Sequence, residues 1–248
     1  ALVANRTFSD FWIYTGMMDG DDVLDPVVLL YNSSSRTINV SIYHGSSGSL
    51  WWSSQHPSNL TIPHSPQTFD CDNDGVEEFF FISEHYFNWS YAPAYLIQLD
   101  ASGEWSNVSL TGSDAETYGL GLAKTINQNS VEACVSASTG PIDIINATSM
   151  TKISTHNVTS TEYSVTVPVS SYAYHNGSGE STKFLLYLYL IDELGYSMGY
   201  HVFDGSTPRI NETPLFTIRD IVYMDPTLID VDSDGTDEII GLNYFSDE

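Results

Sequence analysis

The apolar residues of this chain fall in short runs separated by turn residues. The runs are rich in β-branched and aromatic side chains, as at residues 27–31, 78–83 and 183–191. Glycine, serine, asparagine and proline stand between them, for example at residues 45–48. No longer stretch has the apolar spacing of an amphipathic helix. The pattern therefore predicts an all-β protein.

The runs form successive groups of about four predicted strands each. The groups cover residues 27–69, 78–126, 132–175 and 183–229. One further strand precedes them at residues 11–15, and another follows them at residues 238–245. A repeated four-stranded unit accounts for this layout, with an incomplete unit left over at the two ends.

Two acidic nonamers stand directly before apolar strands. Residues 70–78 read D-C-D-N-D-G-V-E-E, and residues 230–238 read D-V-D-S-D-G-T-D-E. Carboxylates at alternate places, with glycine sixth and an acid ninth, can surround a hard cation with oxygen, which suits calcium better than zinc or copper. An EF-hand needs a glutamate at the twelfth place, where this chain has Phe81 and Gly241. The alternative is that such stretches simply form turns.

The distance between the nonamers indicates an internal repeat. Their first residues are 230 − 70 = 160 apart, close to three times 53. One step of 53 before Asp70 lies Met17, from which Asp19, Asp21 and Asp25 occupy the third, fifth and ninth places. Two further copies, near residues 123 and 176, keep a turn before a strand without the carboxylates. Four-stranded units repeated at a fixed period are typical of a β-propeller or a related array.

The pattern D-x-D-x-D-G-x-x-D/E followed by an apolar strand resembles the FG-GAP/VCBS repeat of integrin-α-type propellers. The resemblance implies a β-propeller-like array of about five four-stranded repeats in one domain over residues 1–248, with structural Ca²⁺ in its loops. The family usually has about seven blades, more than this chain supplies at its period. The implied ligands are Asp70, Asp72, Asp74, Val76 and Glu78; Asp230, Asp232, Asp234, Thr236 and Glu238; and, where Met17 and Asp22 replace the first acid and the glycine, Asp19, Asp21 and Asp25.

The two ends of the chain leave the last blade open to three interpretations. The N-terminal strand at residues 11–15 can pair with the C-terminal strand at residues 238–245 and close a ring. Alternatively, a neighbouring subunit completes the last blade by adding a strand to its exposed edge. If each subunit completes the last blade of the next one head to tail, and the series does not close into a ring, the subunits build a filament. In the third interpretation the chain is a piece of a longer one.

The charge balance and the asparagines point to a glycosylated surface. Acidic residues number 32 of 248, whereas lysine and arginine together number only 7, which gives a net charge of −25. Serine and threonine number 54 of 248, so chance would place about 14 × 54/248, or three, of the fourteen asparagines in N-x-S/T, against ten found. The ten predicted glycosylation sites are Asn5, Asn32, Asn39, Asn59, Asn88, Asn107, Asn146, Asn157, Asn176 and Asn211. A chain that is simply rich in serine and threonine is the alternative.

Other features agree with a secreted, extracellular protein. The sequence begins at Ala1 without methionine, as after removal of a signal peptide. The longest apolar run, residues 184–191, is too short to cross a bilayer. Cys71 and Cys134 either form one disulfide or remain two buried thiols. The acidity and the scarcity of cations disfavour nucleic acid and anionic membranes as partners.

Catalytic signals are weak in this sequence. Residues 195–199 fit G-x-S-x-G, but the hydrolase mechanism needs a strand-to-helix elbow, and this segment is predicted to be a hairpin. The adjacent Trp51 and Trp52 point to opposite faces of a predicted strand. One of the two rings is therefore expected to contact a ligand, a glycan or a neighbouring subunit unless both faces of the strand are covered.

These observations leave three functions open. We favour a secreted, heavily N-glycosylated, calcium-stabilised and non-enzymatic structural protein, a subunit of an extracellular filament or surface appendage whose partners are copies of itself. The alternative is a lectin-like or adhesive module that binds cell-surface glycans or proteins with the propeller face. An extracellular hydrolase is the remote alternative. Analogy with the fold alone selects among the three.

Overall fold

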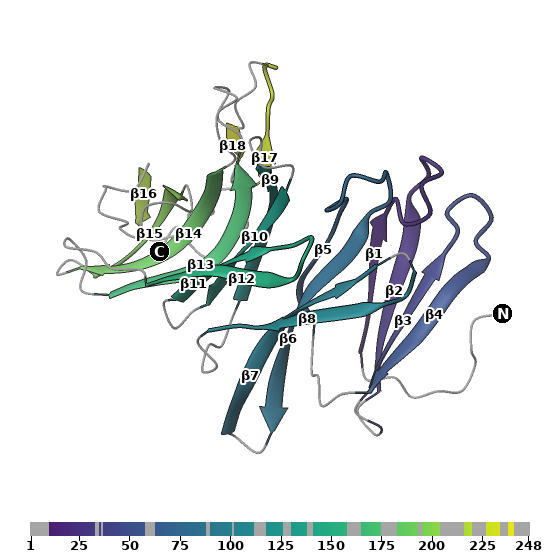
Figure 1. The fold of residues 1–248 in the computed structure, drawn as a ribbon. Helices are drawn as coiled ribbons and strands as arrows, with labels where there is room; N and C mark the ends of the chain where they lie inside the picture. Colours follow the sequence, from purple (N-terminus) through teal and green to yellow (C-terminus); the bar gives the residue numbers. More distant parts are fainter. Residues whose placement is uncertain are drawn as a thin grey trace, which may run out of the picture. The chain divides into compact units, whose positions relative to one another are not determined.

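A computed structural model shows strands as the only regular elements in the part of the chain that it describes (Figure 1). From residue 165 to residue 228 the backbone alone is described. The all-β class predicted from the sequence is confirmed, and no closed propeller is found among the described residues. The description covers residues 10–32, 35, 37–57, 63–87, 90–100, 102–111, 118–125, 130–137, 141–157, 165–174, 183–192, 195–203, 216–219, 227–233 and 238–240.

The described strands form five antiparallel sheets that follow one another along the chain. Within each sheet, strands adjacent in sequence are also adjacent in space, so every sheet is an up-and-down meander. The first sheet contains β1 (Asp10–Gly16), β2 (Asp25–Asn32), β3 (Thr37–Tyr43) and β4 (Leu50–Pro57), and the second contains β5 (Pro63–Phe69), β6 (Glu78–Phe87), β7 (Ser90–Leu99) and β8 (Trp105–Ser109). The third contains β9 (Tyr118–Thr125), β10 (Ser130–Ala137), β11 (Pro141–Asn146) and β12 (Thr151–Asn157), the fourth contains β13 (Val165–Tyr174), β14 (Lys183–Asp192), β15 (Gly195–Phe203) and β16 (Phe216–Arg219), and the fifth contains β17 (Thr227–Ile229) and β18 (Glu238–Ile240).

The sheet boundaries differ from the predicted ones by one strand. The sequence groups began at each acidic nonamer, but the structure places the nonamer inside a sheet, between its first and second strands. The hydrogen-bonded registers show why, because the ninth-place acid pairs directly with the residue that precedes the loop. The pairs are Gly16 with Asp25, Phe69 with Glu78, and Ile229 with Glu238. The acidic loops are therefore hairpin connections.

The first strand of the chain belongs to the first sheet. β1 pairs with β2 along its whole length, from Asp10 opposite Tyr31 to Gly16 opposite Asp25. The described part of the last strand, β18, pairs with β17. Each terminal strand therefore has one described partner, across its own loop. That the two terminal strands share the last blade stays a prediction.

The first and second sheets pack against each other through one apolar cluster. The burial of β2 and β3 alternates, so the first sheet buries one face. In β6, by contrast, the four consecutive residues from Phe79 to Ile82 are buried, so the second sheet buries both faces. The buried members of the cluster are Met18, Val27, Leu29, Ile38, Val40, Ile42, Phe79, Phe81, Ile97 and Leu99.

The chain divides into two compact units, Ala1–Asp114 and Ala115–Glu248. Within each unit the first strands of successive sheets are in contact, β1 with β5 and β9 with β13. The third sheet resembles the second in its burial, because neighbouring residues such as Ala133, Cys134 and Val135 are all buried. No helix among the described residues is long and apolar enough to cross a membrane. The prediction of a single domain stays a prediction.

Candidate metal sites

The first loop (residues 17–25), the second loop (residues 70–78) and the fifth loop (residues 230–238) close in the same way. In each, a carboxylate oxygen of the ninth residue accepts a hydrogen bond from the backbone N–H of the second. This bond joins the two ends of the loop and places the ninth acid at the start of the following strand. The N···O distances are 3.1 Å from Met18 to Asp25, 2.8 Å from Cys71 to Glu78 and 2.8 Å from Val231 to Glu238.

The loops also share their unusual backbone conformations. The fourth residue has a positive φ in all three, with 73° at Gly20, 66° at Asn73 and 62° at Ser233. The sixth residue repeats this in the first two, with 62° at Asp22 and 90° at Gly75. Glycine, asparagine and aspartate reach this region most easily. Asp22 therefore preserves the turn that the sequence pattern assigns to a glycine.

The second loop gathers three carboxylates around its own backbone. Asp70 Oδ1 accepts hydrogen bonds from the N–H of Asn73 at 2.6 Å and of Asp74 at 3.2 Å, and its Oδ2 accepts one from Gly75 at 3.1 Å. Asp70, Asp72 and Asp74 each present an oxygen within 4.8 Å of the others. This donor set contains oxygen only and fits a hard cation such as Ca²⁺. The predicted ligand Glu78 closes the loop, and Val76 donates its N–H to Asp74.

Glu78 and Cys71 form the buried side of this loop. Both side chains are buried, and burial is the main cause that raises the pKa of Glu78. Burial also raises the pKa of the Cys71 thiol, and the neighbouring Glu78 carboxylate adds to the effect. Cys71 Sγ accepts a hydrogen bond from Gln98 Nε2 at 3.3 Å. Cys71 and Cys134 are both buried thiols, one in each unit, so the disulfide alternative is not part of this structure.

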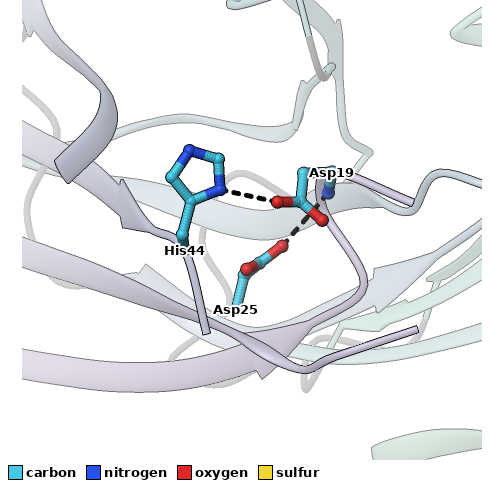
Figure 2. Close-up of side chains that lie close together, drawn as sticks. All are labelled: Asp19, Asp25 and His44. Atoms are coloured by element: carbon cyan, nitrogen blue, oxygen red, sulfur yellow. Dashed lines mark hydrogen bonds and ion pairs between the residues drawn. The ribbon is translucent and has the colours of Figure 1, made fainter. Parts of the chain in front are cut away.

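A histidine that the sequence analysis missed lies against the first loop. His44, which directly follows β3, lies with Asp19 and Asp25 in a cluster whose ligand atoms are within 4.8 Å of one another (Figure 2). His44 Nδ1 is 2.6 Å from Asp19 Oδ2. This hydrogen bond is the main cause that lowers the pKa of Asp19. The His44 ring therefore contacts a carboxylate that the sequence assigned to a cation.

Asp25 accepts three hydrogen bonds from the backbone. It is fully buried, and its Oδ2 accepts hydrogen bonds from the N–H of Met18 and of Asp19, both at 3.1 Å. Its Oδ1 accepts another from Gly45 at 2.7 Å. Asp21, the remaining predicted ligand, lies outside the cluster and accepts a hydrogen bond from Val23 N–H at 3.0 Å. The donor set of the first loop therefore fits Ca²⁺ poorly.

The fifth loop resembles the second in its donor set. Asp230, Asp232 and Glu238 each present an oxygen within 4.8 Å of the others. The predicted ligands Asp234 and Thr236 lie outside the described residues. The described donors are all oxygen, so this loop also fits a hard cation.

The two remaining repeats differ in loop length. β13 and β14 pair from Tyr174 opposite Lys183, which leaves the eight residues 175–182 between this pair. The flanking pairs of the three acidic loops also have eight residues between them. In the third sheet, Thr125 pairs with Ser130, so only residues 126–129 remain. Both connections lie outside the described residues. Lys183 occupies the place of the ninth acid by register, which agrees with the predicted loss of carboxylates there.

The predicted glycosylation sites in the described region lie on accessible positions. Asn107 and Asn157 are exposed, and Asn32, Asn39 and Asn146 are half-buried. The other five, Asn5, Asn59, Asn88, Asn176 and Asn211, lie outside the residues whose side chains are described. Glycosylation itself stays a prediction.

The other candidates are explained by the fold. Trp51 and Trp52 both pack against the apolar cluster, Trp51 with its ring 5.7 Å from that of His44 and Trp52 beside Gly103. The expectation that one of these rings faces a partner therefore loses its basis. Residues 195–199 lie within β15, which pairs with β14, so the G-x-S-x-G sequence is in an extended strand and not at an elbow before a helix.

No family model matches the sequence, and no curated protein matches it significantly. The resemblance to FG-GAP/VCBS repeats therefore stays a prediction that rests on the loop residues named above.

Proposed function

We propose that this protein is a calcium-stabilised, non-enzymatic structural protein, secreted and N-glycosylated, that assembles into an extracellular filament or surface appendage. The observation that carries the proposal is the recurrence of one loop in three sheets, with all-oxygen carboxylate clusters in the second and fifth. The same loop shape recurs within this chain at the connection between the first two strands of a sheet. An ion bound in such a loop would stabilise that connection, which supports a structural role for the ion.

Calcium would be held by Asp70, Asp72 and Asp74 in the second loop and by the described acids Asp230, Asp232 and Glu238 in the fifth. Two carboxylates about 4 Å apart repel by about 1 kcal/mol even in a water-like dielectric, so a bound cation relieves repulsion that the folded loop creates. Extracellular calcium modules bind with dissociation constants on the order of 10⁻⁴ to 10⁻³ M. At millimolar calcium each site then stabilises the fold by roughly 0.4 to 1.4 kcal/mol.

We infer a propeller-like arrangement of the sheets, which would fit the structural role. The four-stranded sheets are meanders of one topology, and successive sheets within each unit meet through their first strands. Propeller blades are four-stranded meanders arranged around a channel in this way. The proposal therefore places the first strand of each sheet on the inner side of the array and the fourth on the outer side.

The extracellular location is supported by the sequons and by the calcium loops together. Ten of fourteen asparagines lie in N-x-S/T, and every one whose side chain is described is at least partly accessible. N-linked glycans are added in the secretory pathway, and millimolar calcium is found outside the cell. Both features suit a protein that works outside the cell.

Electron microscopy of the native protein in millimolar calcium tests the assembly. We expect filaments or head-to-tail oligomers whose number increases with protein concentration. Strictly monomeric particles at every concentration would contradict the proposal. Calorimetry with and without a chelator tests the ion, and an unchanged melting curve would contradict the calcium sites.

A further inference from the structure

The first and second loops are in direct contact within the first unit. Met17, the first residue of the first loop, and Glu77, the eighth residue of the second loop, exchange two hydrogen bonds. The Met17 N–H donates to Glu77 Oε2 at 2.8 Å, and the Glu77 N–H donates to the Met17 carbonyl oxygen at 2.9 Å. The two residues are 60 positions apart in the sequence, so this contact joins the first hairpin of one sheet to the first hairpin of the next.

Two glycines of the first sheet allow this close approach. A Cβ atom added at Gly16 would lie 2.5 Å from Thr68 Cγ2 and 2.8 Å from Glu77 Oε2, so β1 can approach β5 this closely only with glycine at that position. On the other side of Met17, a Cβ atom added at Gly20 would lie 3.3 Å from Val76 Cγ2. The second loop therefore packs against the first through its seventh and eighth residues.

The shape of an acidic loop does not require an acid at the eighth place. The first loop closes in the same way as the second and has Leu24 at that place, 57 % exposed. In the second loop the eighth residue, Glu77, is half-buried, and its carboxylate accepts the backbone N–H of the preceding loop. The carboxylate of Glu77 therefore serves the contact between the two loops.

The candidate calcium ligands hold the backbone directly before Glu77. Asp70 Oδ2 accepts the N–H of Gly75 at 3.1 Å, and Asp74 Oδ1 accepts the N–H of Val76 at 2.8 Å. Without an ion, the three clustered carboxylates repel one another, and two of them are the acceptors of these bonds. A cation that fixes the carboxylates therefore also fixes the segment that positions Glu77.

We propose that calcium bound in the second loop also fixes the contact between the first two sheets, and that Glu77 passes this effect to Met17. The inference rests on the proposed function, because it needs the ion in the second loop. The first loop, whose own donor set fits Ca²⁺ poorly, is then stabilised by the ion of its neighbour. The effect travels through a continuous series of hydrogen bonds from the ion ligands to the first loop.

Amide hydrogen exchange of the full chain tests this coupling, because it reports on each loop separately. We expect 1 mM calcium to slow the exchange of the Met17 N–H and of the Asn73 N–H, which Asp70 accepts, by about two- to tenfold each. In Glu77→Ala the Met17 N–H loses its acceptor, so only Asn73 should still respond to calcium. Glu104→Ala, which removes an exposed glutamate directly before β8, is the matched control and should keep both responses.

A second variant approaches the contact from the first sheet. Gly16→Ala leaves the charges of the second loop unchanged, but its methyl group displaces Thr68 and Glu77. Because coupling between two sites is reciprocal, this change should weaken calcium binding to the second loop by at least about twofold. Calcium titrations followed by the amide signals of Asn73 and of Ser233 measure the second and fifth loops separately, and the fifth loop should be unaffected.

The outcomes separate this inference from the proposed function. If calcium slows exchange at Asn73 and not at Met17 in the wild type, the coupling is wrong and the calcium site of the second loop stands. A Met17 response that persists in Glu77→Ala would equally overturn the role of Glu77. If calcium changes neither amide, the calcium site of the second loop fails, and the coupling fails with it.

Discussion

The first and second loops have the same backbone form and different side chains inside it. Both close through the ninth acid, and both have positive φ values at the fourth and sixth residues. At the first place, however, one has Met17, and the other has Asp70, whose carboxylate accepts three backbone N–H groups. The first loop uses His44 where the second gathers a third carboxylate.

This difference separates two roles that the acidic pattern combines. The ninth acid and the turn residues hold the shape of the loop through hydrogen bonds to the backbone. When the first place holds an acid, the loop has an excess of negative charge that requires a cation. Without that acid, it does not. Loop shape and calcium dependence should therefore respond to different substitutions.

The largest effect is expected from removing a ninth acid. Asp25→Ala would leave three backbone N–H groups without an acceptor at a fully buried position, and should lower the free energy of unfolding by about 3 kcal/mol. Glu78→Ala frees the N–H of Cys71 and should cost less. Urea unfolding in chelator measures both, and Asp25→Asn, which keeps one carbonyl acceptor, is the control. A greater loss for Glu78→Ala than for Asp25→Ala would contradict this order.

Calcium should stabilise the second loop by binding there and have no direct effect on the stability of the first. We expect that adding millimolar calcium raises the melting temperature, with roughly 0.4 to 1.4 kcal/mol per occupied site. Asp72→Ala should remove the part of this calcium-induced stabilisation that comes from the second loop, because it removes one of the three clustered carboxylates. Asp19→Ala, at the same place in the first loop, is the matched control. Equal losses of calcium response in the two variants would contradict the distinction between the loops.

The ion pair of the first loop should contribute roughly 0.5 to 1 kcal/mol, because the His44 side chain is one-third exposed and partly screened by solvent. His44 lowers the pKa of Asp19, so the charged carboxylate is favoured in the folded state. As far as Asp19 is concerned, this contribution is present above its unfolded pKa and is lost as the pH falls through its lower folded value, and it also requires the protonated form of His44.

A double-mutant cycle with Asp19→Asn and His44→Ala measures the coupling energy and separates it from the ring contact between His44 and Trp51. The coupling should decline as the pH is lowered from about 6 towards 2. A coupling that is constant over this range would show that the pair is not ionic.

The loops were predictable because their information is local. The spacing of the carboxylates and the turn residues lie within the nonamers, the apolar run follows directly, and the structure places residues 70–78 between two strands, as expected. The sheet boundary was not predictable in the same way. β5 is short and polar, with Pro63, Pro66 and Gln67 in it, and only its pairing with β6 shows that it begins the second sheet. β12 was missed because its large apolar residue, Ile153, is exposed.

His44 was missed for a different reason. It is 44 − 19 = 25 residues from Asp19 and lies outside the acidic patterns. Its contact with the loop arises from the packing of the turn after β3 onto the start of β2, where Gly45 N–H meets Asp25. Such a contact between connections of one sheet has no spacing rule in the sequence. The missing first acid at Met17 was the only local sign that the first loop would be balanced differently.

The smallest effect is expected when the first loop is given the acid that it lacks. Met17→Asp supplies a carboxylate at the place of Asp70, which can accept the N–H groups of the following turn and stabilise it without an ion. While His44 still balances Asp19, this variant should gain little calcium response. Combined with His44→Ala, it should gain a response of about 0.4 kcal/mol in calcium titrations followed by thermal unfolding. A full response in the single variant would mean that the first-place acid alone creates the site, and that the histidine does not take the place of the cation.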